Sequence, residues 1–160
     1  MVSDGTFGGT ALAAAAAALG VAVLAFVRAR KSPGVSVVVT DKAPAAVGPY
    51  VQATKDGRGF IFVSGQVGFI PGSNKFDGPD AVSQARRSLA NIKAILEAAG
   101  SSMDRVLKTT VLLTDINDYA KVNEVYAEAF GNHKPARAAY AVKTLPVNAV
   151  VEIEAIALEK

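Results

Sequence analysis

The sequence contains no cysteine and a single histidine among its 160 residues. Without cysteine the chain has no disulfide, no thiolate nucleophile and no cysteine-ligated zinc. The lone histidine, His133, leaves no multi-histidine metal site, and we do not expect a histidine-based triad. Glycine-rich phosphate loops and clusters of metal-ligating residues are also missing from the sequence. We therefore expect a protein that works without a metal ion or a cofactor.

The net charge is also small in the part of the chain that is expected to fold. The formal net charge of the whole sequence is +3. Three basic residues (Arg28, Arg30 and Lys31) and one acidic residue (Asp4) precede Ser32, so about +1 remains for the rest of the chain. Proteins that bind nucleic acid concentrate basic residues on their surface. A dedicated nucleic-acid surface is therefore not expected.

The longest uncharged stretch lies near the N-terminus, where Phe7 to Val27 form a run of 21 residues. As a helix this run would be about 30 Å long, which is enough to cross a bilayer. The basic residues that follow would keep the remaining chain on the cytoplasmic side. We predict that residues 1–34 are a transmembrane anchor or targeting segment with a linker, and that residues 35–160 are the folded domain.

Alanine makes up much of this N-terminal run and is only weakly hydrophobic, so insertion into a membrane would be marginal. Two alternatives therefore stay open. One is a targeting peptide for the mitochondrion or another organelle, and the other is a disordered alanine-rich tail.

Residues 35–160 alternate between strand-like and helix-like patterns. Strands are expected at Val35–Thr40, Tyr50–Thr54, Gly59–Ser64, Arg105–Leu113, Arg137–Val142 and Val150–Leu158. Apolar residues at steps of three and four predict one helix from Asp80 to Gly100 and another from Asn117 or Asp118 to Gly131. The expected fold class is α+β, with a ββαβαββ mixed sheet and both helices on one of its faces.

Some of the expected strands carry apolar or small residues on both faces. In one strand, Val106, Thr110 and Leu112 alternate with Leu107, Val111 and Leu113. Because two helices cover only one face of the sheet, we expect the other face to be buried against a partner subunit. The pattern predicts an oligomer without setting its size.

Charged residues in the last two expected strands are the best candidates for chemistry. Arg137 shares its strand face with Ala139 and Ala141. A guanidinium with small neighbours has room to grip a planar anion, such as a carboxylate, with two parallel hydrogen bonds. Glu152 and Glu154 share one face of the last strand, where a carboxylate can handle a proton of water. This suits hydrolysis of a small electrophilic carboxylate; the alternative is a structural Arg–Glu cross-strand pair.

Seven short segments occur in an order and at a spacing that are specific when taken together. They are Val47-Gly48-Pro49-Tyr50-Val51-Gln52, Val63-Ser64-Gly65-Gln66-Val67, Lys108-Thr109-Thr110-Val111, Val122-Asn123-Glu124-Val125-Tyr126, Lys134-Pro135-Ala136-Arg137-Ala138-Ala139-Tyr140, Leu145-Pro146 and Glu152-Ile153-Glu154-Ala155-Ile156-Ala157. With these segments the chain closely resembles the RidA (YjgF-type) family of enamine and imine deaminases. The resemblance runs from about Thr40 to Leu158 and says nothing about the N-terminal run.

The resemblance implies a homotrimer of chorismate-mutase-like (bacillus-type) protomers, with active sites in the clefts between subunits. It implies hydrolysis of 2-imino and enamino acids, such as 2-iminobutanoate and 2-iminopropanoate, to 2-oxo acids and ammonia without a cofactor. The imine carbon of these substrates is already electrophilic, so positioning and one acid–base group suffice. Two other functions stay open: an RNA-binding endoribonuclease that inhibits translation, and a trimer that binds small carboxylates without turnover.

The same resemblance assigns roles to the charged residues. Arg137, together with the backbone N–H of Ala139, would hold the substrate carboxylate, and Glu152 would position and activate the attacking water. Many microbial members carry cysteine where this chain has Ala139, whereas animal-type members also have alanine. Glu154, on the face of Glu152, could equally be a partner in a structural pair.

Four more residues are expected at the site. Tyr50 and Asn123 match positions close to the substrate, although each also suits a structural place on its strand or helix. Gly65 would let the backbone approach a ligand closely. Ser64 is expected to form hydrogen bonds and not to act as a nucleophile, because no base adjoins it in the sequence.

Overall fold

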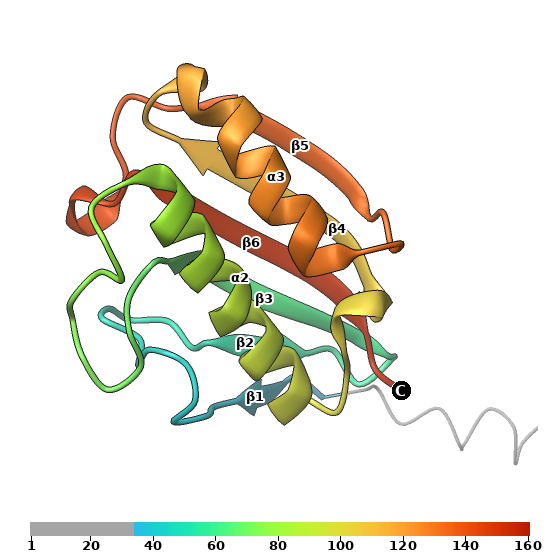
Figure 1. Ribbon diagram of the computed structural model, residues 1–160. Coiled ribbons are helices and arrows are strands. Elements are labelled where there is room, and N and C mark those ends of the chain that lie inside the picture. Colours follow the sequence, from blue (N-terminus) through green and yellow to red (C-terminus); the bar gives the residue numbers. More distant parts are fainter. Residues whose placement is uncertain (1–33) are drawn as a thin grey trace, which may run out of the picture. The chain divides into compact units, whose positions relative to one another are not determined.

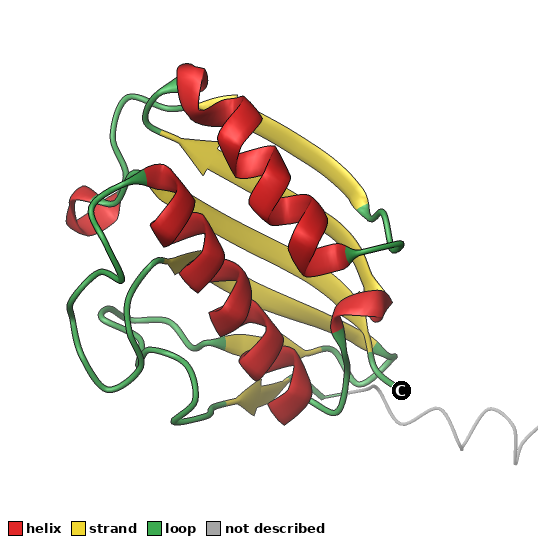
Figure 2. Cartoon of the chain, in the orientation of Figure 1, coloured by secondary structure: helices red, strands yellow, loops and turns green. Residues whose placement is uncertain are grey.

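Two helices lie side by side on one face of a six-stranded sheet in the computed structural model, which describes residues 34–160 (Figure 1). The helices are α2 (Ala81–Ala98) and α3 (Tyr119–Phe130). The strands are β1 (Ser36–Val38), β2 (Ala53–Lys55), β3 (Phe60–Val67), β4 (Val106–Leu113), β5 (Ala136–Ala141) and β6 (Val151–Leu158). Short 3₁₀ turns occupy Met103–Arg105, Ile116–Asp118 and Pro146–Asn148. The predicted α+β class, with both helices on one face of a mixed sheet, is confirmed (Figure 2).

Helix α2 begins and ends where its sequence indicates. The carboxylate of Asp80 accepts hydrogen bonds from the backbone N–H groups of Val82 and Ser83, both at 3.0 Å, and so satisfies donors that the first turn leaves free. Gly100 follows the last turn with φ +80°, a conformation that ends a helix and favours glycine. Between these two points the apolar stripe of α2 is buried in the core against the sheet.

The order of the strands is β1-β2-β3-β6-β4-β5, so β6 is inserted in the middle of the sheet. Strand β5 forms the edge and runs parallel to β4, while all other neighbours are antiparallel. The last two strands of the chain are therefore not neighbours, because β4 lies between them. This rules out, within one chain, the alternative of a structural cross-strand pair between Arg137 and Glu152.

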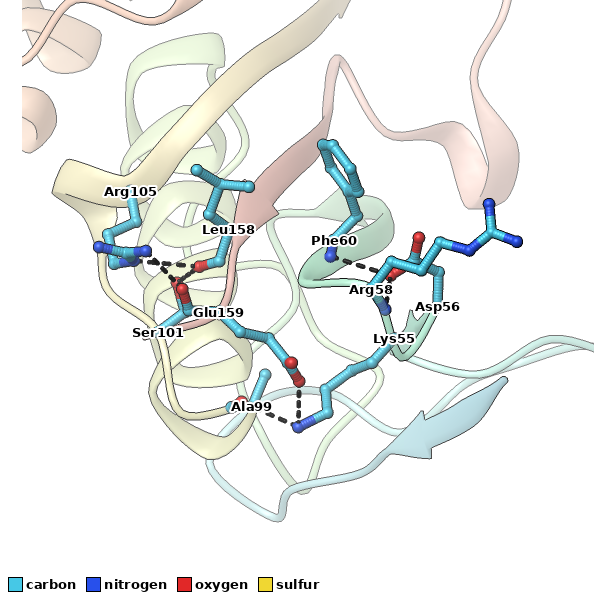
Figure 3. A network of polar contacts seen from close by, with 9 residues as sticks. All are labelled: Lys55, Asp56, Arg58, Phe60, Ala99, Ser101, Arg105, Leu158 and Glu159. Carbon is cyan, nitrogen blue, oxygen red and sulfur yellow. Dashed lines mark hydrogen bonds and ion pairs between the residues drawn. The ribbon is translucent and has the colours of Figure 1, made fainter. Parts of the chain in front are cut away.

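The C-terminal end of β6 is fastened to the loop that follows α2 (Figure 3). The hydroxyl of Ser101 donates to the carbonyl oxygen of Leu158 at 2.6 Å, and the guanidinium of Arg105 donates to the same oxygen and to that of Glu159. The Glu159 carboxylate in turn pairs with Lys55 of β2. These contacts hold the C-terminal end of β6 in place.

The face of the sheet opposite the helices is uncovered within residues 34–160. Large apolar side chains on this open face remain exposed: Val37 (58%), Phe60 (39%), Phe62 (44%) and Tyr140 (51%). Val37 and Phe62 lie in one row, because both oppose Thr54 of β2, whereas Tyr140 lies further along the same face, in the row of Leu112 and Glu152. The sequence-based expectation of two apolar sheet faces is therefore met.

The prediction of a transmembrane protein needs correction. None of the helices found in residues 34–160 is both long enough and apolar enough to cross a bilayer. The segment on which the prediction rested, Phe7–Val27, lies outside the described residues. We therefore withdraw the transmembrane assignment.

Candidate functional site

A pocket of about 300 Å³ opens on the uncovered side of the sheet. It is lined by Val47, Tyr50, Ser64, Gly65, Val67, Pro146, Val147 and Glu152. Four of the predicted site residues, Tyr50, Ser64, Gly65 and Glu152, thus come together in one place. The remaining lining is apolar except at the backbone.

The carboxylate of Glu152 lies directly against the backbone of Gly65. A Cβ atom added to Gly65 would lie 1.9 Å from Oε1 of Glu152, far inside contact distance. The pairing of β3 with β6 shifts register between Val63 and Gln66, so Gly65 lies in a bulge that faces the carboxylate. The missing side chain of Gly65 therefore makes room for the side chain of Glu152. The approach of a ligand to this backbone stays a prediction.

Partial burial changes the acidity of this carboxyl group. Desolvation raises the pKa of Glu152 above its ordinary value, and the neighbouring charge of Glu154 raises it further. Glu154 itself is exposed and forms no ion pair with any residue in 34–160. A carboxyl group with a raised pKa can both take up and release a proton closer to neutral pH.

Two other residues of this pocket also have structural bonds. The hydroxyl of Ser64 donates to the carbonyl oxygen of Val51 at 2.7 Å, which ties β3 to the segment before β2. The phenolic oxygen of Tyr50 accepts from the N–H of Val47 at 3.3 Å, which closes the turn on which the ring stands. Both side chains are therefore oriented by the fold before any ligand arrives.

Arg137 lies in a different pocket, of about 320 Å³, on the helix side of the sheet. This second pocket is lined by Asn123, Tyr126, Ala127, Phe130, Gly131, His133, Lys134, Pro135 and Arg137. The structure thus brings Asn123 next to Arg137, as predicted for two residues of one site. It does not bring either of them next to Glu152.

Two tyrosines of α3 hold the guanidinium of Arg137. Its central carbon lies 4.6 Å from the centre of the Tyr126 ring, a cation–π contact, and Nη2 donates to the hydroxyl of Tyr119 at 3.1 Å. The hydroxyl of Tyr126 is bonded to that of Thr109 at 2.7 Å, and burial raises the pKa of Tyr126. Neither Tyr119 nor Tyr126 was among the residues that the sequence predicted for the site.

The single histidine is used for structure. Nε2 of His133 donates to the carbonyl oxygen of Val106 at 2.6 Å, which ties the loop before β5 to the start of β4. Because a carbonyl oxygen only accepts, this nitrogen carries the proton. His133 therefore lines the second pocket with one of its two ring nitrogens already engaged.

Ala139 lies in β5, the strand at the edge of the sheet, where backbone groups are left without a neighbouring strand. Val142 donates its N–H to the carbonyl oxygen of Leu113 in β4 at 2.8 Å. Successive N–H groups of a strand point in opposite directions. Arg137 and Ala139 are an odd number of residues before Val142, whose N–H points toward β4, so their N–H groups point outward from the edge of the sheet. Donors directed away from the sheet are thus available beside the guanidinium.

The register of the sheet sets the two pockets on opposite faces. Arg137 opposes Thr109 of β4, which opposes Ala155 of β6, and Ala155 is buried beneath the helices. Glu152 opposes Leu112, whose other partner is the exposed Tyr140. Residues directly opposite each other share a face, so Arg137 faces the helices and Glu152 faces the open side.

No group of three or more metal-ligating side chains is gathered to hold a metal ion anywhere in residues 34–160. The two pockets offer the Glu152 carboxyl group and the Arg137 guanidinium, together with the Lys134 ammonium, the His133 imidazole, the Asn123 amide and several hydroxyl and backbone groups.

Known proteins share this arrangement of sequence and fold. The family model described as "Endoribonuclease L-PSP" matches residues 40–159. A RutC family protein of Pyrococcus horikoshii is 51% identical over 124 residues, covering 78% of this chain and 98% of its own length. The 2-iminobutanoate/2-iminopropanoate deaminase of Mus musculus is 50% identical over 123 residues, covering 77% of this chain and 90% of its own length.

Solved structures agree. The structure of Escherichia coli TdcF with bound serine has a TM-score of 0.73 and 42% identity, covering 78% of this chain and 99% of that one. Matches of this extent and identity confirm the resemblance that the sequence motifs indicated. The chain belongs to the endoribonuclease L-PSP family, the family also known as RidA or YjgF.

Proposed function

We propose that this protein is a cofactor-free hydrolase that converts 2-imino acids, and the enamines in equilibrium with them, to 2-oxo acids. In the reaction R–C(=NH)–COO⁻ and water give R–C(=O)–COO⁻ and ammonia. 2-Iminobutanoate and 2-iminopropanoate are the proposed substrates, in line with the printed name of the mouse relative. The amino acid bound to TdcF supports a site that accepts a small molecule with a carboxylate.

The observation that carries the proposal is the Glu152 carboxyl held against Gly65 with a raised pKa. In the proposed mechanism its ionised form removes a proton from a water as the water attacks C2 of the imine. The protonated carboxyl gives this proton to the imine nitrogen, so the tetrahedral intermediate carries a hydroxyl and an amine on the same carbon. The carboxylate then transfers the hydroxyl proton to the amine, and ammonia leaves as the carbonyl forms.

Arg137 is the proposed anchor for the substrate carboxylate. Its guanidinium is fixed by Tyr119 and Tyr126, and the outward N–H groups of β5 supply further donors beside it. A fixed planar fork holds a carboxylate with two parallel hydrogen bonds. Holding the substrate in one orientation above the water is a large part of what a reaction with an intrinsically reactive imine requires.

We further propose that each site is shared between copies of the chain in a homotrimer. Arg137 and Glu152 face opposite sides of one sheet, so a single copy does not bring both to one substrate. The open face that holds the Glu152 pocket also carries the exposed side chains of Phe60, Phe62 and Tyr140, as expected for a surface that another copy covers. A neighbour that places its β5 edge over this pocket would complete the site.

The direct test of activity is ammonia release from 2-iminobutanoate generated in the assay by an amino acid oxidase. We expect the full-length protein to accelerate ammonia release and the Glu152→Gln variant to lose most of that acceleration. The same preparations are tested for loss of RNA at matched salt. RNA loss without ammonia release would replace the deaminase proposal by the ribonuclease alternative.

The test of a shared site is subunit mixing. Arg137→Ala and Glu152→Gln variants, each inactive alone, are unfolded, mixed in equal amounts and refolded together. If each site takes Arg137 from one copy and Glu152 from another, random assembly regenerates about a quarter of the sites. Activity that stays at the level of the separate variants, while size-exclusion chromatography shows mixed oligomers, would place both residues in one copy's site and contradict the proposal.

A further inference from the structure

Two neighbouring residues beside the Glu152 pocket have a backbone conformation that L-amino acids rarely adopt. Val147 has φ 53° and ψ 22°, and Asn148 has φ 61°. They are the only residues other than glycine with positive φ in the part of the chain that the structure describes. Asparagine tolerates this left-handed region, whereas a β-branched residue is a genuine outlier there. Val147 is therefore the more strained of the two.

The ends of this turn are fixed by the surrounding structure. Leu145 (8% exposed) and Ala149 (2% exposed) are buried on either side of it. The N–H of Ala149 donates to the carbonyl oxygen of Pro146 at 3.0 Å, and the N–H of Val150 donates to Oε1 of the buried Gln84 in α2 at 2.9 Å. A strained conformation persists where its surroundings determine it in this way.

The strained turn places the side chain of Val147 on the wall of the Glu152 pocket. Val147 is 47% exposed and lines the pocket together with Pro146, Val47 and Val67. These four residues form an apolar wall, while the polar groups of the pocket are gathered around Glu152. Asn148, although it shares the unusual backbone, is not part of the lining.

We infer that Val147 determines which substrate side chain the pocket accepts. The inference rests on the proposed function, in which Glu152 acts at C2 of a 2-imino acid and the group R must lie elsewhere in the same pocket. The apolar wall is the surface that suits an alkyl R, and Val147 is its most exposed aliphatic member after Val47. With Val147 in place the wall fits a short alkyl group and limits longer ones.

The test compares three variants of the full-length protein. Val147→Ala removes two methyl groups and keeps a Cβ; Val147→Gly also relieves the strained φ. Asn148→Gly is the matched control, because it relieves the same kind of backbone conformation one residue away without touching the lining. The kcat/KM values are measured for the 2-imino acids derived from alanine, 2-aminobutanoate and leucine, and Tm is measured to confirm that each variant is folded.

We expect both Val147 variants to raise the kcat/KM ratio of the leucine-derived imine to 2-iminopropanoate by at least about tenfold, the scale of added or lost apolar groups in a pocket. Asn148→Gly should leave that ratio unchanged. A shift in Val147→Gly and Asn148→Gly but not in Val147→Ala would assign the effect to backbone freedom and overturn the inference. An unchanged ratio in all three variants would overturn it as well.

A binding measurement separates this inference from the proposed activity. The dissociation constants of 2-oxobutanoate and 4-methyl-2-oxopentanoate are measured by calorimetry for the same proteins. Absence of turnover in the wild-type protein refutes the deaminase proposal. The role of Val147 would still be supported if both Val147 variants bound 4-methyl-2-oxopentanoate more tightly, relative to 2-oxobutanoate, than the wild type does. Turnover in the wild type without any change of preference refutes the role of Val147 alone.

Discussion

Arg137 and Glu152 lie on opposite faces of one sheet, with β4 between their strands. Arg137 opposes Thr109 of β4, whose side chain faces the helices, and Glu152 opposes Leu112 of β4, whose side chain faces the open side. An ion pair between Arg137 and either glutamate of β6, the structural alternative that the sequence left open, is therefore absent within residues 34–160. Substituting one of the two residues should not disturb the fold around the other.

The first prediction concerns the shape of the anchoring group. Arg137→Lys keeps the charge but loses the planar fork and the stacking on Tyr126. We expect kcat/KM for 2-iminobutanoate to fall by an amount equivalent to about 2–4 kcal/mol in transition-state free energy, with little change in Tm. Steady-state kinetics and thermal unfolding of the purified variant provide the measurement.

Tyr119→Phe is the control for this substitution. It removes only the hydroxyl that accepts from Arg137 at 3.1 Å and leaves the guanidinium in place. A smaller loss of activity than in Arg137→Lys is expected, because the Tyr126 ring still supports the guanidinium. Near wild-type turnover in Arg137→Lys would remove Arg137 from the role of anchor.

The second prediction separates the two carboxylates of β6. Glu152→Gln should abolish most turnover, because an amide cannot act as a general base for the attacking water, while Kd for 2-oxobutanoate should change little. Glu154→Gln is the matched control on the same strand face, and its side chain is exposed. We expect Glu154→Gln to retain most of the activity. Equal losses in the two variants would show that the assignment of proton transfer to Glu152 is wrong.

Local features of the fold were readable from the sequence. Asp80 and Gly100 mark the ends of α2 because capping and left-handed termination depend on residues next to each other in the chain. The alternation of Val151, Ile153 and Ala155 with the two glutamates predicts the buried side of β6, and the structure confirms it. In each case a short stretch of chain contains all the information that the inference needs.

Features that depend on pairing between distant segments were not readable in the same way. Nothing local indicates that β6 inserts between β3 and β4, or the register with β4 that sets Arg137 and Glu152 on opposite faces. Tyr126 looks like an ordinary core aromatic until its ring is found beneath Arg137. The strained φ of Val147 carries no sequence signal, because positive φ is expected at glycine and not at valine.

The third prediction follows from the raised pKa of Glu152. A carboxyl group whose pKa is higher in the folded than in the unfolded state favours the protonated form on folding. The contribution of Glu152 to the free energy of unfolding therefore decreases as the pH rises from its pKa in the unfolded state through its pKa in the folded state. Above both pKa values the decrease is constant. Glu152→Gln removes this loss, so its Tm should exceed that of the wild type at neutral pH, and the difference should shrink on acidification.

Thermal unfolding from pH 4 to pH 8 provides this measurement, with Glu154→Gln measured in parallel. A gap between wild type and Glu152→Gln that widens toward acid pH would have the opposite sign and would contradict the assigned shift. The kinetic and the unfolding measurements then report independently on the carboxyl group of Glu152.

The last prediction tests the contact between Gly65 and Glu152. In Gly65→Ala the new Cβ would meet Oε1 of Glu152 at 1.9 Å, so the carboxylate must leave its position. We expect turnover to fall by at least about a hundredfold, because a misplaced catalytic group loses its orientation. We also expect a lower Tm, because the clash lies in a bulge that is paired with the central strand.

A double-mutant cycle shows whether the clash is with Glu152 itself. A Glu152→Ala background removes the three atoms nearest to the added Cβ, since all three belong to the Glu152 side chain. Gly65→Ala should therefore lower Tm only slightly in that background and clearly more in the wild type. Such a difference between the two backgrounds is the coupling expected for residues in contact. Equal losses of Tm in both backgrounds would mean that the glycine is required by its backbone or by other neighbours, and the proposed placement of the carboxylate by Gly65 would be wrong.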